Sequence, residues 1–242
     1  MSETPAISLQ ELQLAARNHG MPLELLREPV TPVGLHYLLI HYDIPAVDAE
    51  TWRLDVDGRT YSLDELRTLP SHEVVSTMEC AGNGRANLEP HVVSQPWLLE
   101  AVGTGRWRGV RLRDLIEPRA DTVEVLFTGL DRGVEGGEEQ LYQRSLTVED
   151  ALADDVLLAY DLNGAPLPPQ HGFPLRLLVP GWYGMTNVKS RADRAARRAV
   201  RRLPADARLS LSQPRGRSRR ARVAHRASRA DGAAGHPRHP HA

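Results

Sequence analysis

The sequence predicts an α+β domain built around a mixed sheet and followed by a disordered, arginine-rich tail. The first 189 residues hold short apolar runs between turn-forming residues, without the regular strand–helix alternation of a doubly wound parallel sheet. Residues 190–242 contain no aromatic residue and no isoleucine, so they cannot bury enough apolar area to offset their ordering entropy. We therefore expect an N-terminal helix or extension over 1–26, a folded domain over 27–189 and a disordered basic tail over 190–242.

Hydrophobic periodicity and turn signals define the first expected elements. Residues 8–18 place apolar side chains on one helical face. An apolar run with interleaved aromatic residues predicts a buried strand over 35–42. Alternation predicts a strand over 51–58 that closes on an Asp-Gly turn, and a serine followed three residues later by a glutamate predicts a capped helix over 62–69. A further apolar strand is expected over 73–80.

The same signals predict the elements of the second half. An amphipathic pattern indicates a helix over 110–117, and an apolar alternation indicates a strand over 122–129. A threonine with an aspartate three residues later is expected to begin a helix over 148–153. Strands are predicted over 156–164, where an Asn-Gly turn follows, and over 173–181.

The charge of the chain changes abruptly at its tail. Residues 1–189 hold 15 Lys and Arg against 28 Asp and Glu, whereas residues 190–242 hold 15 Arg against 3 Asp. Our hypothesis is that a one-base frameshift near codon 190 produced the tail, and a natural basic arm is the alternative. Clustered arginines without interleaved aromatic residues attract nucleic acid only non-specifically, and a basic nucleic-acid-binding protein is the non-enzymatic alternative.

Several classes of protein are disfavoured by composition. No apolar run reaches the 18 residues of a membrane-spanning helix, so no membrane partner is expected. The N-terminus shows neither a secretory pattern nor a twin-arginine pair, which predicts a cytoplasmic location. The single cysteine excludes an intrachain disulfide and a multi-cysteine zinc site. The oligomeric state has no signature in the sequence.

That cysteine, Cys80, begins a loop of unusual composition. It ends an apolar strand and is followed by Ala-Gly-Asn-Gly-Arg, in which two glycines allow the backbone to approach a bulky group. Arg85 is expected to stabilise a thiolate or to bind an anion. A dinucleotide-binding motif is disfavoured because Asn87 stands where a third glycine is required. A thiolate nucleophile and a metal-bound thiolate both fit this pattern.

The segment STMECAGNGR at 76–85 resembles the molybdenum-ligand loop of the sulfite oxidase family of molybdopterin oxidoreductases. Segments at 39–45, 103–116, 141–146 and 157–189, the last with His-Gly-Phe-Pro and Val-Pro-Gly, resemble further family motifs in the same order. The resemblance implies the sulfite-oxidase-type molybdopterin-binding fold. It also implies one molybdenum–molybdopterin cofactor per chain and no haem in this chain.

The resemblance also implies residue roles. Cys80 would ligate molybdenum together with two sulfurs of the pterin, a soft ligand set that suits a redox metal. Tyr142 would lie beside the metal, and Arg85 would bind the negative charge of the substrate, which gives Cys80, Tyr142 and Arg85 as the catalytic set. The cofactor itself would be held by matching positions, namely His41, Cys80, Arg106, His171, Arg176 and Lys189.

The implied reaction is oxygen-atom transfer, with sulfite oxidised to sulfate and electrons passed to a separate carrier such as a cytochrome. The substrate would be a small anion or sulfur oxide. Animal and plant sulfite oxidases carry an arginine where this sequence has Leu39, which predicts weaker binding of a dianion. A sulfoxide reductase of the same superfamily is the alternative enzymatic interpretation.

Overall fold

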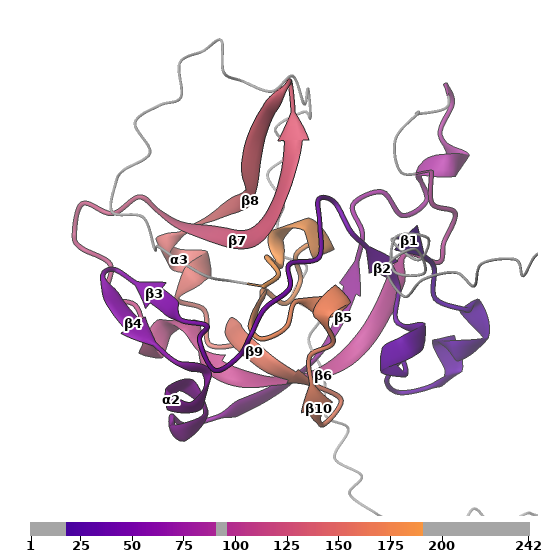
Figure 1. Cartoon of the computed structure of the whole chain (residues 1–242). Coiled ribbons are helices and arrows are strands. Elements are labelled where there is room, and N and C mark those ends of the chain that lie inside the picture. The colour runs from indigo at the N-terminus through magenta and orange to yellow at the C-terminus, as the bar shows by residue number, and fades with distance from the viewer. Residues whose placement is uncertain (1–17, 91–95, 191–242) are drawn as a thin grey trace, which may run out of the picture. The chain divides into compact units, whose positions relative to one another are not determined.

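The computed structural model describes residues 18–90 and 96–190, which all belong to one compact unit (Figure 1). The helix expected over 8–18 and the tail after residue 190 lie outside the described residues. The described part is mostly β, with two short α-helices, so the sequence overestimated its helical content. Every strand pairing in this part is antiparallel, so the prediction of a mixed sheet is wrong.

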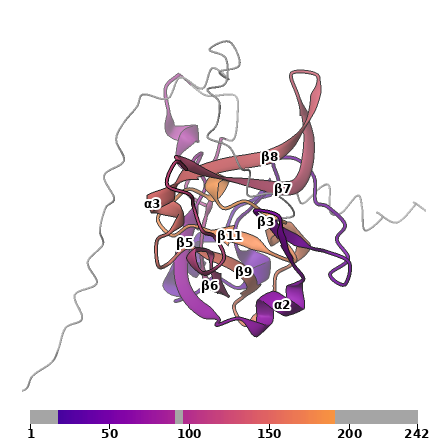
Figure 2. The ribbon, with the colours of Figure 1, turned by 90° about the vertical axis from the view of Figure 1, so that its left-hand side faces the viewer.

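A five-stranded sheet forms the centre of the domain (Figures 1 and 2). Strands β5 (His72–Glu79), β6 (Val102–Arg111), β9 (Leu157–Leu162) and β10 (Ala165–Pro166) follow one another in the order β10-β9-β6-β5, and β11 (Arg176–Leu178) also pairs with β9. Five of the six residues of β9 are buried, as expected for a strand covered on both faces. The apolar runs at 73–80 and 156–164 are therefore confirmed as strands.

Strand β6 corrects the prediction of a helix over 110–117. Its residues pair with β5 along the whole length of that strand and with β9 through a bulge between Arg108 and Gly109. The strand continues through Arg111, and only a 3-10 turn, Leu112–Asp114, remains of the expected helix. The amphipathic pattern that suggested a helix is short, and the strand is stabilised by pairing with neighbouring strands on both edges. Such tertiary contacts outweigh a local helical preference.

Local chemistry explains the small hairpin and the helices. Strands β3 (Leu54–Val56) and β4 (Arg59–Tyr61) flank the predicted Asp-Gly turn, whose two residues both have positive φ, as a type I′ turn requires. The capping box predicted from Ser62 is present and begins α2 (Leu63–Thr68). Thr147 caps α3 (Val148–Ala151), which ends earlier than expected. These confirmed elements depend on contacts within four residues.

The N-terminal part of the described chain packs on the domain. Strand β1 (Asn18–His19) pairs with β2 (Leu38–Leu39), and Met21 is buried in the core. The strand expected over 35–42 is thus reduced to two residues. The described 3-10 helices are short and connect the strands: η1 Leu23–Arg27, η2 Val33–Leu35, η3 Arg85–Asn87, η4 Leu112–Asp114, η5 Pro169–His171 and η6 Gly184–Thr186.

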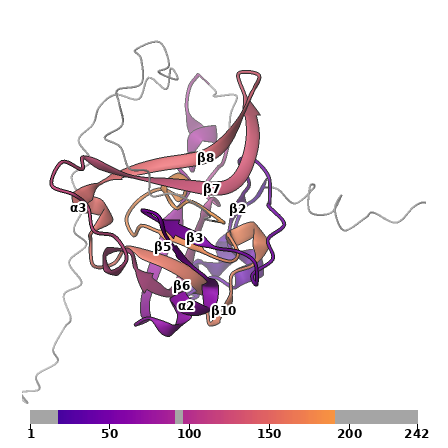
Figure 3. The ribbon, with the colours of Figure 1, turned by 60° about the vertical axis from the view of Figure 1, so that its left-hand side comes forward.

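A long hairpin lies across one side of the central sheet. It consists of β7 (Glu124–Glu135) and β8 (Glu138–Thr147), with a register shift between Thr128 and Arg132. Figures 2 and 3 show the hairpin running over the strands of the sheet, and the end with its turn projects away from them. The strand predicted over 122–129 is confirmed as the first part of β7.

The apolar core forms two clusters, one on each face of β9. Leu158 and Tyr160 belong to the larger cluster, together with Phe127 and Leu146 of the hairpin. Leu157 and Ala159 belong to the second cluster. Successive strand side chains point to opposite faces, so the sheet separates the two clusters. No described helix is long and apolar enough to cross a membrane.

Candidate functional site

Four basic side chains gather beside β11, and we call them the basic cluster: His36, His171, Arg176 and Lys189. Arg176 lies on β11, His171 ends η5, and His36 follows η2. The rings of His36 and His171 meet edge to face with centroids 5.3 Å apart. His36 lies against β6 at Gly103, where a Cβ atom would come within 2.6 Å of its ring. The structure thus brings three of the predicted cofactor-binding residues together.

Arg176 is buried and hydrogen-bonds to no carboxylate among the described residues. Its Nη1 donates to the His171 carbonyl (3.1 Å), its Nη2 contacts Met78 Sδ (2.9 Å), and its guanidinium lies 5.3 Å from the Trp107 ring centroid. Its Nε has no hydrogen-bond partner in the part of the chain that the structure describes. Among the described residues Arg176 forms no ion pair, and burial lowers its pKa to about 10. A buried guanidinium of this kind favours an anion as its partner.

Burial dominates the titration of the rest of the cluster. It lowers the pKa of His36 to about 4 and that of His171 to about 2, so both imidazoles are neutral near pH 7. Lys189 is half-buried, and its Nζ donates to the Leu39 carbonyl (2.7 Å). Burial lowers its pKa to about 7. These lowered pKa values disfavour the positively charged forms of the side chains. An anion that enters the cluster would favour the charged forms again.

One buried carboxyl group accompanies these bases. Asp131 lies on β7 and interacts electrostatically with both Lys189 and Arg176. Burial raises its pKa to about 6, and its Oδ1 has no hydrogen-bond partner among the described residues. This single carboxyl only partly balances the two cations. The arrangement is therefore suited to hold a buried anionic group.

Cys80 directly follows β5 and lies half-buried in its loop. Its N–H donates to the Ala101 carbonyl (2.9 Å), and the N–H of Gly82 points at its Sγ (3.3 Å). A backbone donor of this kind stabilises a thiolate. The described residues contain no group of three or more His, Cys, Asp or Glu that could hold a metal ion. A metal at Cys80 therefore needs ligands that the described residues do not supply.

Tyr37 connects the thiol with the basic cluster. It is 7% exposed, and it interacts electrostatically with both Arg176 and Cys80. Burial raises its pKa, which keeps the hydroxyl protonated. Tyr37 lies in the apolar run at 35–42, where nothing in the sequence distinguishes it from a core residue.

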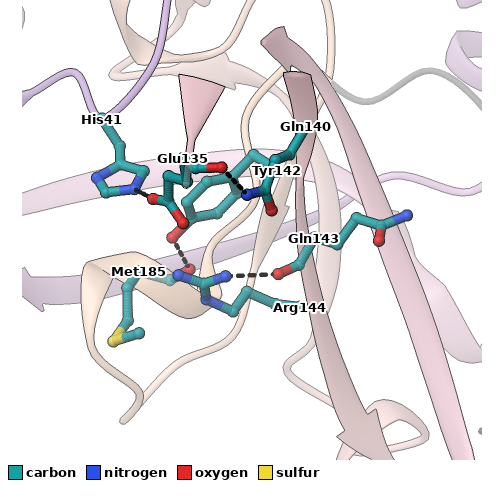
Figure 4. Close-up of polar contacts among 7 residues, drawn as sticks. All are labelled: His41, Glu135, Gln140, Tyr142, Gln143, Arg144 and Met185. Atoms are coloured by element: carbon teal, nitrogen blue, oxygen red, sulfur yellow. Dashed lines mark hydrogen bonds and ion pairs between the residues drawn. The ribbon is translucent and has the colours of Figure 1, made fainter. Parts of the chain in front are cut away.

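Tyr142 lies on β8 and faces the domain, as Figure 4 shows. It is 9% exposed, and its hydroxyl donates to the Met185 carbonyl (2.7 Å). Burial raises its pKa to about 12. Electrostatic interactions join it to Arg176, Asp131 and Arg144. The predicted catalytic tyrosine thus lies near the basic cluster, with its hydroxyl held by a backbone carbonyl.

His41 and Arg106 lie outside the basic cluster. His41 follows β2 and is exposed, so its predicted place on a buried strand is wrong. Its Nε2 contacts Glu135 Oε1 (3.0 Å), and its ring lies 5.7 Å from that of Tyr142 (Figure 4). Arg106 is exposed on β6 and pairs with Glu73 (3.1 Å), whereas its neighbour Trp107 is buried. The alternation of β6 therefore turns Arg106 away from Trp107 and Arg176.

Arg85, the remaining predicted site residue, begins η3 in the loop that Cys80 opens. It is half-buried, and its N–H donates to the Gly82 carbonyl (3.1 Å). The structure thus keeps it in the same loop as Cys80. Sequence reasoning missed His36, Tyr37 and Asp131 as neighbours of the site. Only His36 offers a signal, because a histidine inside an apolar run is a candidate for a buried polar contact.

Comparison with known proteins identifies the family of this arrangement. The family model described as "Oxidoreductase molybdopterin binding domain" matches residues 41–192. The chain is 41% identical over 190 residues to sulfite oxidase of Gallus gallus, covering 71% of this chain and 40% of that protein. It is 38% identical over 188 residues to mitochondrial sulfite oxidase of Rattus norvegicus, covering 71% of this chain and 34% of that protein.

A further relative and a solved structure with the same fold extend the comparison. NADH nitrate reductase 1 of Oryza sativa subsp. japonica is 37% identical over 176 residues, covering 66% of this chain and 19% of that protein. The sulfane dehydrogenase SoxCD from Paracoccus pantotrophus shares the fold, with a TM-score of 0.60 at 24% identity over 79% of this chain and 47% of that one. The chain thus spans less than half the length of these relatives. It belongs to the family of oxidoreductase molybdopterin-binding domains.

Proposed function

We propose that the domain binds one molybdenum–molybdopterin cofactor and oxidises sulfite to sulfate by oxygen-atom transfer. The observation that carries this proposal is the basic cluster, a set of buried bases with one partly compensating carboxyl, near a half-buried cysteine. Buried cations are stable when they are paired with an anion. A pterin that carries a phosphate and two metal-binding sulfurs offers both the anion and the metal ligands that the described residues lack.

The described residues fit this cofactor. Arg176, Lys189 and His171 would hold the phosphate and ring, because they offer N–H donors at buried or half-buried positions. His36 offers a further ring nitrogen that lacks a well-directed hydrogen bond. Cys80 would ligate molybdenum through its Sγ, toward which the Gly82 N–H points. Bound there, the cofactor supplies the two-electron redox chemistry that oxygen-atom transfer requires.

The protein's own residues would bind and orient the substrate. Arg85 is proposed to attract the negative charge of sulfite. The high pKa of Tyr142 keeps its hydroxyl protonated, so that it serves as a hydrogen-bond donor after small rearrangements at Met185. Oxidation of sulfite consumes one water and releases two protons and two electrons. The electrons would pass to a separate one-electron carrier such as a cytochrome.

Substitution of Cys80 tests this proposal. Cys80→Ser should abolish sulfite oxidation with an artificial one-electron acceptor, because an alcohol does not replace a thiolate as a soft ligand. Pterin fluorescence after denaturation should persist, since the basic cluster remains. Circular dichroism and thermal unfolding serve as controls for folding. Full oxidase activity in Cys80→Ser would contradict the ligand assignment. Sulfoxide reduction without sulfite oxidation by the wild type would instead assign the alternative reductase activity.

A further inference from the structure

A second arginine, which the site prediction did not include, lies next to Tyr142. Arg144 is two residues along β8 and therefore faces the same side of the strand. It is half-buried, and its Nε is inaccessible to solvent and has no hydrogen-bond partner. Its Nη1 donates to the carbonyl of Gln143 (2.6 Å). Within residues 18–90 and 96–190, Arg144 forms no ion pair.

The guanidinium of Arg144 is held against the tyrosine. Its Cζ lies 4.3 Å from the centroid of the Tyr142 ring, a cation–π contact. Figure 4 shows the guanidinium beside Met185, whose carbonyl accepts the Tyr142 hydroxyl. Arg144 is the largest electrostatic influence that opposes the burial-driven rise in the pKa of Tyr142. The ring thus fixes this cation close to the tyrosine hydroxyl.

Three exposed arginines of the domain, by contrast, have acidic partners. Arg132 pairs with Glu139 (3.1 Å), Arg106 with Glu73 (3.1 Å), and Arg113 with Asp154. These three are exposed, whereas Arg144 is half-buried, and the partners of its guanidinium among the described residues are a carbonyl and aromatic rings. A guanidinium presents planar N–H groups that match two oxygens of an oxyanion. Arg144 therefore retains donors for an anion.

We propose that Arg144 binds the anionic oxygens of the substrate beside Tyr142, and so selects small oxyanions of sulfur over neutral sulfoxides. This inference rests on the proposed function and names the substrate class of that site. Arg144 supplies from β8 a positive charge that the sequence lacks at Leu39. It acts as a substrate-binding residue, and Arg85 supplies a second cation from the loop of Cys80.

Variants of two arginines on the same hairpin test this role. Arg144→Gln removes the charge beside Tyr142, Arg144→Lys retains it without the planar fork, and Arg132→Gln is the control with an equal loss of net charge. The KM and kcat for sulfite are measured on the holoprotein. Isothermal titration of the same protein with sulfate gives the dissociation constant of an oxyanion independently of turnover.

Arg144→Gln should raise both the KM for sulfite and the dissociation constant of sulfate by about tenfold or more, as expected for a lost charge-assisted contact. The kcat should change by less than about threefold. Arg144→Lys should fall between Arg144→Gln and the wild type. Arg132→Gln should change neither constant by more than about twofold.

Three results would overturn the inference. The first is a sulfate dissociation constant that is unchanged in both Arg144 variants, and the second is an equal change in Arg132→Gln. A fall in kcat at constant sulfate affinity would also contradict it, because it would assign Arg144 to positioning Tyr142. A protein that purifies without molybdenum and pterin would refute the proposed function, while the sulfate titration would still test Arg144.

Discussion

The two sides of the candidate site differ in how tightly their residues are held. The central sheet and the turns around it bury the basic cluster: His36 is 1% exposed, Arg176 3% and His171 6%. The β7–β8 hairpin holds Tyr142 buried but leaves Arg144 half-buried, and its Leu141 and Val134 are 38% and 70% exposed. A permanent cofactor gains from fixed, desolvated contacts, whereas a substrate that enters and leaves needs accessible ones.

The central sheet and the β7–β8 hairpin also differ in how their strands are paired. Within the sheet, β6 and β9 each have a partner strand on both edges, whereas among the described strands β7 and β8 pair only with each other. A two-stranded ribbon gains little stability by itself and depends on the face that it packs against the core. Stability should therefore be concentrated in the sheet, and substitutions there should cost more than substitutions toward the turn of the hairpin.

The largest expected effect is at Trp107 on the sheet side. Trp107→Ala removes a fully buried ring that packs beneath the Arg176 guanidinium. It should lower the free energy of unfolding by about 3–5 kcal/mol, measured by urea denaturation. Leu141→Ala on the hairpin should lower it by less than about 1 kcal/mol, because that side chain is already partly in water. Equal losses would contradict the comparison.

A pH profile should reveal the buried imidazole of His36. Its pKa falls from 6.5 in the unfolded chain to about 4 in the folded protein. Below pH 6.5 the unfolded chain therefore binds a proton that the folded protein does not, so His36 lowers stability as the pH falls toward 4. His36→Phe should remove on the order of 3 kcal/mol of this acid-dependent loss, measured by denaturation at successive pH values.

Other buried groups remain in both proteins of that pH experiment. His171 has the same sign as His36, whereas Asp131, with its raised pKa, favours the folded state at lower pH. Both contributions cancel largely when the variant is compared with the wild type. Parallel pH profiles for the two proteins would show that His36 is not a buried neutral imidazole.

Tyr142→Phe should have a small effect on stability. The variant loses one hydrogen bond to the Met185 carbonyl, which is worth about 1 kcal/mol. If the hydroxyl serves the reaction, the kcat for sulfite should nevertheless fall by at least about tenfold. Measuring both quantities on one preparation separates a role in folding from a role in catalysis. Unchanged turnover would remove Tyr142 from the proposed catalytic set.

Features set by neighbouring residues were predictable from the sequence. The Asp-Gly turn before β4, the capping box at Ser62 and the cap at Thr147 each depend on contacts within four residues. Whether two strands pair parallel or antiparallel depends on residues far apart in the chain. Local sequence patterns therefore could not distinguish the expected mixed sheet from the antiparallel sheet of the structure. A short amphipathic run fits a helix as well as a strand edge, which explains the error at 110–117.

In the candidate site too, some features were predictable from the sequence and others depend on the fold. His171, Arg176 and Lys189 were expected to bind one cofactor, and the structure brings them together. The outward direction of Arg106 follows from the strand parity of β6, which a predicted helix beginning at residue 110 obscured. The partners of Arg144 depend on Tyr142 and Met185, which the fold brings together across 43 residues of sequence. No local sequence pattern predicts a contact of this kind.

The central claim is that the basic cluster, rather than the exposed arginine of β6, holds an anionic molybdopterin. It is tested most directly by the molybdenum and pterin content of three purified proteins: the wild type, Arg176→Met and Arg106→Gln. The wild type should carry one molybdenum and one pterin per chain, Arg176→Met should lose most of both, and Arg106→Gln should retain them. A wild type without pterin, or loss of pterin in Arg106→Gln but not in Arg176→Met, would contradict the account.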